Sequence, residues 1–136
     1  MKPLDEAKRE FVQQWIDKAE QDFGLAEHML EEHSPYLGAM GFHCQQAAEK
    51  YLKAFLIHHQ VDFPKTHDIV EILDLVAQVA PALAQSLREL RALSPYGVNI
   101  RYPGDIPDLT LPEAEQAVEL AGRARDSILS ALRGLI

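Results

Sequence analysis

The strongest candidate for binding chemistry is Arg101, which lies with Tyr102 in the irregular segment Ser94–Leu111. Prolines and glycines recur along this segment, and irregular stretches longer than about 12–15 residues inside compact domains are often functional. A proline-stiffened loop holds an arginine at a low cost in entropy, and the planar guanidinium suits a phosphate or a carboxylate. The structural alternative is an ion pair that attaches the segment to the rest of the protein, with Asp105, Asp108 or Glu49 as the acid.

Three polar side chains of the stretch Met40–His59 are the next candidates for ligand binding: Gln46, Lys50 and Lys53. If this stretch is a helix, they lie opposite its apolar stripe and converge with the arginine across a cleft. The alternative is that they form a solvated stripe or one that faces a second subunit. Two apolar residues on the same side, Phe42 and Ile57, favour the subunit contact.

Two histidines complete the set of candidate ligand-binding residues, His43 and His67. His67 followed by Asp68 resembles a base with a carboxylate that orients it. The structural reading is that Asp68 favours a helix start, while His67 packs against the preceding loop. His43 lies between the apolar stripe and the polar side, where a ligand contact and an ordinary hydrogen bond are both open.

The sequence predicts no metal ion, no cofactor and no catalytic residues. His58 and His59 are adjacent, so on a helix their side chains point about 100° apart and make a poor shared metal site, even with Asp62 nearby. No Ser/His/Asp set is visible. The seven glycines never cluster into a phosphate-binding loop.

The composition is that of a folded globular protein. Its 136 residues are 47% hydrophobic and 25% charged, which is typical of an ordered domain. The net charge of −8 argues against a general nucleic-acid binder, which usually presents a basic surface. No apolar run reaches the roughly 18 residues that span a membrane. With a charged N-terminus and Cys44 as the single cysteine, we expect a cytoplasmic protein.

The stretch Met40–His59 is the predicted centre of the fold. Its apolar residues recur at helical spacing and form one broad stripe, which comprises Met40, Cys44, Ala47, Ala48, Tyr51, Leu52 and Phe55. Because the opposite side is also partly apolar, we expect neighbours on both sides. This pattern indicates the central helix of a bundle.

Four other helices are predicted around the central one, which begins near Pro35 and ends at His58 or His59. The first covers 5–33, the third opens at 66–68 with Thr66 as its N-cap, and the fourth begins at Pro81 and carries leucines 83, 87, 90 and 93. The last begins near Pro112, with Thr110 as N-cap. The fold class is therefore all-α, an antiparallel bundle of four to five helices.

Three fragments in this order resemble the HEPN family (higher eukaryotes and prokaryotes nucleotide-binding domain). They are FHCQQAAEKYLKAFL in the central helix, THDIVEIL at the start of the third helix, and NIRYP in the irregular segment. The resemblance covers nearly the whole chain and implies one HEPN-like helical domain over residues 1–136, of the short prokaryotic type. It also implies a homodimer and a minimal nucleotidyltransferase partner encoded alongside, often in toxin–antitoxin fashion.

Many members of the family are metal-independent ribonucleases that carry an arginine followed, after four to six residues, by a histidine. This sequence departs from that pattern, because Arg101 is followed by YPGDIPDL and no histidine occurs after His67. The favoured hypothesis is therefore a non-catalytic module that binds a nucleotide, a nucleotidyltransferase partner or both. A divergent ribonuclease, with His43 or His67 as the acid–base group, is the alternative, and a purely structural subunit is the third.

Overall fold

The computed structural model describes residues 4–97 and 108–133. In chain order they form α1 (Leu4–Glu31), α2 (Leu37–His58), α3 (Ile69–Val79), α4 (Pro81–Ser86), the 3₁₀ helix η1 (Arg88–Gly97) and α5 (Leu111–Arg133). These described residues contain no β-strand. The all-α prediction is confirmed. No helix in the described ranges is both long and apolar enough to cross a lipid bilayer.

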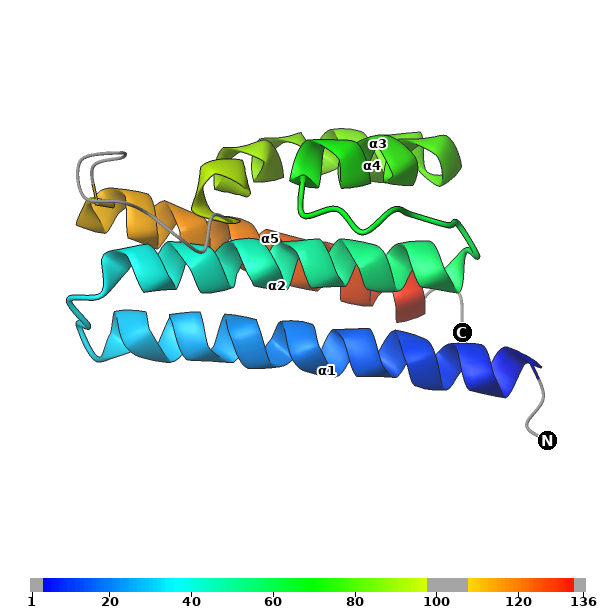
Figure 1. The fold of residues 1–136 in the computed structure, drawn as a ribbon, viewed down its shortest axis with the longest axis horizontal. Helices are drawn as coiled ribbons and strands as arrows, with labels where there is room; N and C mark the ends of the chain where they lie inside the picture. Colours follow the sequence, from blue (N-terminus) through cyan, green and yellow to red (C-terminus); the bar gives the residue numbers. More distant parts are fainter. Residues whose placement is uncertain (1–3, 98–107, 134–136) are drawn as a thin grey trace.

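Helix α2 is the centre of the bundle, as its sequence pattern predicts. Helices α1 and α5 run along it, and α3, α4 and η1 form a shorter layer on its other side (Figure 1). The seven residues of its apolar stripe, from Met40 to Phe55, are all buried. Burial also extends to polar residues on the opposite side of α2, because the connection between α2 and α3 covers that side.

Local signals fix the ends of several helices. His33 and Gln60 follow α1 and α2 with φ angles of 55° and 57°. At each, the next amide donates to a carbonyl five residues earlier, at 2.9 Å, which closes the helix in a Schellman-type turn. At the start of α5, Thr110 Oγ1 accepts from the Glu113 amide at 3.3 Å and the Thr110 amide donates to Glu113 Oε1 at 2.9 Å. Thr110 is therefore the N-cap, as predicted, in a capping box.

The predicted N-cap of the third helix is wrong by two residues. Asp68, not Thr66, caps α3, because its carboxylate accepts from the Val70 amide at 2.9 Å. Thr66 lies outside the helix, where its hydroxyl accepts from the Asp68 amide at 3.0 Å. An aspartate binds the free amides of a helix start more strongly than a threonine does, since its oxygen is charged.

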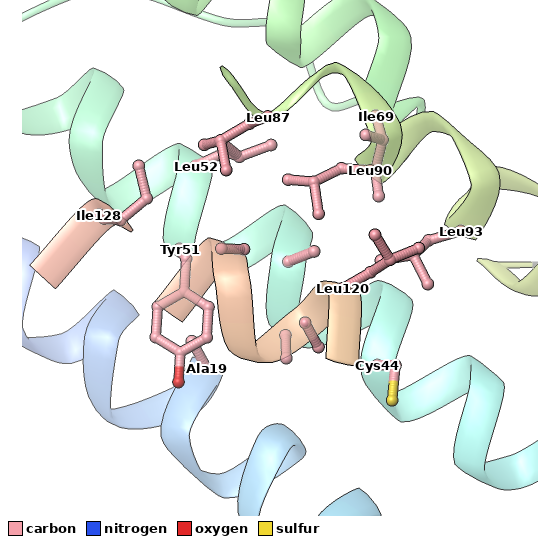
Figure 2. Close-up of a cluster of buried hydrophobic side chains, with 14 of the residues drawn as sticks. Ala19, Cys44, Tyr51, Leu52, Ile69, Leu87, Leu90, Leu93, Leu120 and Ile128 are labelled. Carbon is pink, nitrogen blue, oxygen red and sulfur yellow. The ribbon is translucent and has the colours of Figure 1, made fainter. Parts of the chain in front are cut away.

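The predicted fourth helix is also divided. It ends as an α-helix at Ser86, and a 3₁₀ helix continues to Gly97. Leu87, Leu90 and Leu93 are three residues apart, and a 3₁₀ helix has three residues per turn, so all three side chains point to the core. Figure 2 shows them among three other buried side chains, Leu52, Ile69 and Leu120.

Candidate functional site

A line of buried polar side chains runs along α2 beneath the connection to α3. Gln45, Glu49 and Lys53 are four residues apart and are only 0%, 2% and 4% exposed. Side chains at this spacing lie above one another on a helix. Lys53 Nζ donates to Glu49 Oε2 at 3.0 Å, and Gln45 Nε2 donates to Glu49 Oε1 at 3.2 Å. The carboxylate therefore has a donor on either side along the helix.

The connection between α2 and α3 covers this line of polar groups. Its Thr66 carbonyl accepts from Lys53 Nζ at 2.8 Å, and its His67 carbonyl accepts from Gln45 Nε2 at 3.0 Å. The rings of Trp15, from α1, and Phe63 lie 5.5 and 5.4 Å from Lys53 Nζ. An ammonium group over aromatic faces is attracted by their negative quadrupoles. The lysine is thus enclosed by its own chain.

His67 is the exposed end of this network. Its Nδ1 lies 3.0 Å from Glu49 Oε1, while the side chain is 72% exposed. A carboxylate only accepts hydrogen bonds, so Nδ1 is the donor and, in the neutral ring, Nε2 is left as an acceptor. We call Gln45, Glu49, Lys53 and His67 the α2 polar cluster. Its histidine is oriented by a buried carboxylate, an arrangement that suits proton transfer.

A second network joins α1 to α2. Asp22 of α1 lies 3.0 Å from His43 Nδ1 and accepts a hydrogen bond of 2.5 Å from Lys50 Nζ. All three side chains are partly buried. His43 and Lys50, two of the predicted ligand residues, therefore both bond to Asp22 of the neighbouring helix. No spacing or motif in the sequence singles out this aspartate.

A third network ties the three long helices together. Tyr51 OH donates to Glu20 Oε1 at 2.5 Å, and Arg125 Nε of α5 donates to the same oxygen at 2.8 Å. Burial and the hydrogen bond to Glu20 raise the pKa of Tyr51, and the hydrogen bond to Glu20 raises that of Arg125. The two partners of the ion pair are 105 positions apart, so no sequence spacing could have revealed it.

The candidate ligand-binding residues are brought together only in part. Lys53 and His67 share Glu49, and Gln46 joins them by donating to Gln45 Oε1 at 2.7 Å. The expectation that Lys50 and Lys53 form one solvated or subunit-facing stripe needs correction, because they bind different acids and Lys53 is buried. Positions 50 and 53 are only about 60° apart around a helix, so their separation comes from their partners, Asp22 of α1 for Lys50 and Glu49 of α2 for Lys53.

Arg101 and Tyr102 lie outside the described residues. The residues that flank this undescribed stretch contact α2 at both ends. A Cβ added to Gly97 would lie 2.9 Å from Gln45 Cδ, and one added to Gly38 would lie 3.0 Å from Asp108 Oδ1. Within the described ranges, no three His, Cys, Asp or Glu side chains are placed to hold a metal ion.

Comparison with known proteins identifies the family. The sequence model of the HEPN domain matches residues 12–130. The chain belongs to the HEPN family.

Two solved structures have the same HEPN fold. TT1696 from Thermus thermophilus is 26% identical, with a TM-score of 0.70 over 88% of this chain and 96% of its own. ST0689, described as an archaeal HEPN homologue, is 22% identical, with a TM-score of 0.67 over the same shares of the two chains. A comparison with curated proteins gives no match.

Proposed function

We propose that this HEPN protein is a non-catalytic binding module that acts in the cytoplasm as a homodimer. Its partner would be a minimal nucleotidyltransferase, in a toxin–antitoxin-like pair, and its ligand a nucleotide. The observation that carries the proposal is the missing ribonuclease motif. No arginine of the sequence is followed by a histidine after four to six residues. In-line cleavage of RNA needs a group that transfers a proton.

The ion pairs on α2 support a binding role for other surfaces. Lys50 and Lys53 are each bonded to an acid of the same chain, which lowers their availability to a phosphate. Exposed apolar side chains, in contrast, favour a protein contact. Tyr36 and Leu111 are 70% and 52% exposed, and Leu111 borders a shallow hollow of about 220 Å³ next to Pro35.

Co-purification tests the partner. The protein is co-expressed with the nucleotidyltransferase of a neighbouring gene, and the complex is measured by size exclusion with light scattering. We expect co-elution, and we expect Tyr36→Ser with Leu111→Ser to weaken it. The matched control is Val79→Ser, which removes an exposed apolar side chain from α3.

Thermal melting with and without ATP tests nucleotide binding, because a ligand that binds only the folded state raises the melting temperature. Arg101→Ala is expected to reduce this rise, in line with the prediction that Arg101 and Tyr102 contribute to the site. Absence of co-elution together with an unchanged melting temperature would count against the proposal.

A divergent ribonuclease is the second candidate, and the geometry of His67 favours it. The ring is exposed and its Nδ1 is held by buried Glu49, which prepares Nε2 to accept a proton. RNA cleavage by the wild type that is lost in both Arg101→Ala and His67→Ala, but kept in the control His28→Ala, would support this activity. Wild-type protein that leaves RNA intact at high concentration would exclude it.

A further inference from the structure

A hollow of about 530 Å³ opens at one end of the bundle. Helix α1 begins at this end, whereas α2 and α5 finish there (Figure 1). The hollow lies far along α2 from Gln45, and none of its lining residues belongs to the α2 polar cluster. Its volume is within the range of about 300–1,000 Å³ that is typical of small-molecule sites.

The floor of this hollow is apolar. Val12 and Ile16 of α1 form one side of it, and Leu129 and Leu132 of α5 form the other. Three of these side chains are buried and Leu129 is half-buried. The hydrophobic effect therefore favours an apolar body over water in this position.

The rim of the hollow is basic although the protein is acidic. Lys8, Arg9 and Arg133 contribute three positive charges and Asp5 one negative charge, in a chain whose net charge is −8. None of the three cations forms an ion pair with another described residue. Among the described residues no acid neutralises their charge, which can therefore act on a ligand.

His58 also lines the hollow, and the charge of Lys8 affects its pKa. Burial and then the charge of Lys8 lower the pKa of His58. The ring is thus neutral at pH 7, and the attraction for an anion comes from the lysine and the two arginines. A guanidinium or ammonium group beside an apolar floor suits a carboxylate, sulfonate or phosphate.

We propose that this hollow binds a small organic anion with an apolar body. The body would cover the α1–α5 floor, and its single acidic group would lie at the basic rim. A nucleotide, with its polar sugar and several phosphates, matches an apolar floor less well, so this site is separate from the nucleotide binding proposed above.

A pair of fluorescent probes tests both halves of the site. The anionic probe is 8-anilinonaphthalene-1-sulfonate, and N-phenyl-1-naphthylamine is its neutral counterpart without the sulfonate. We expect Lys8→Glu and Arg133→Glu each to weaken binding of the anionic probe about fivefold, and the double variant about twentyfold, as for exposed charge pairs. Binding of the neutral probe should not change. The control Lys65→Glu makes the same change in net charge at an exposed lysine away from the hollow and should bind both probes as the wild type does.

Three outcomes would overturn the proposal. The first is equal affinity of the wild type and the double variant for the anionic probe. The second is an equal loss in the Lys65→Glu control, which would assign the effect to net charge. The third is a parallel loss of the neutral probe in a variant that keeps the wild-type melting temperature, which would show that the rim charges do not act on the acidic group. If a charge-reversal variant melts early, Lys8→Met with Arg133→Met removes the same charges and keeps the apolar stems.

Salt gives an independent readout. Raising the ionic strength should weaken binding of the anionic probe to the wild type, because it screens exposed charges. The same change should have little effect on the double variant. Salt dependence that is identical in the two proteins would also contradict an anion site at this rim.

Discussion

Replacing Glu49 by glutamine is the sharpest test of the α2 polar cluster. The substitution keeps the size of the side chain and removes its charge. Lys53, which is only 4% exposed, then has no anionic partner. Its remaining contacts are the Thr66 carbonyl at 2.8 Å and the rings of Trp15 and Phe63.

The expected loss follows from the cost of leaving a buried charge unpaired. Removing one partner of a buried ion pair typically destabilises a protein by about 3–5 kcal/mol. The carbonyl and the aromatic rings still solvate part of the ammonium group here, so we expect the lower end, about 3 kcal/mol. For a domain of this size that corresponds to a fall of about 10 °C in melting temperature.

Urea unfolding measures this loss, with the circular dichroism of the helices and the fluorescence of Trp15 as two probes. The chain has one tryptophan, so its emission reports on the surroundings of Lys53. The matched control is Glu119→Gln, because Glu119 forms the same i,i+4 type of pair, with Arg123 at 2.9 Å, in an exposed position. We expect no measurable change in the control, since water screens its charges.

A double variant separates charge from packing. Glu49→Met combined with Lys53→Met removes both charges, and we expect it to be more stable than Glu49→Gln, because a neutral buried pair carries no desolvation penalty. The reasoning would be refuted if Glu49→Gln lost less than about 1 kcal/mol, the range of an exposed pair. It would also be refuted if the double variant were the least stable of the set.

Three further substitutions or conditions probe other parts of the molecule. Lowering the pH from 7 to 5 should reduce the free energy of unfolding, because burial and the charge of Lys8 lower the pKa of folded His58. Below about pH 6.5 the unfolded chain therefore binds more protons than the folded one. Urea unfolding of His58→Asn should show a smaller dependence on pH, and a pH dependence equal to that of the wild type would contradict this. Burial raises the pKa of the Cys44 thiol to about 12. Ellman's reagent at pH 8 should therefore label the native protein far more slowly than the denatured protein. Rapid labelling of the native protein would show that the thiol is accessible. Gly97→Ala should cost about 1–3 kcal/mol by overpacking, because its Cβ would lie 2.9 Å from Gln45 Cδ; an unchanged urea midpoint would mean that Gln45 shifts without strain.

Much of the fold was readable from the sequence because helix signals are local. The apolar spacing of Met40–Phe55 identified α2 as the central helix, and the burial of that stripe confirms it. Thr110 caps α5 as predicted, and the structure adds its reciprocal hydrogen bond with Glu113. The family was also recognisable, since its fragments are continuous in the chain and the HEPN domain matches residues 12–130.

The pairing of side chains was not readable, because it depends on how helices lie against one another. Sequence spacing placed Lys50 and Lys53 on one polar face, yet Lys50 binds Asp22 of α1 and Lys53 is covered by the α2–α3 connection. The division of α4 from η1 has a similar origin, since a backbone with three residues per turn is the one that buries Leu87, Leu90 and Leu93 together against the core.

The sequence by itself determined the helices, most of their ends, the family and the absence of the arginine–histidine motif, since each of these is written in residues a few positions apart. Only the tertiary structure decided that Glu49 and Lys53 are buried, that His67 is held by a carboxylate 18 positions away, and that three cations gather around an apolar hollow. The physical reason is that burial and electrostatic fields are set by neighbours in space, and those neighbours come from distant parts of the chain.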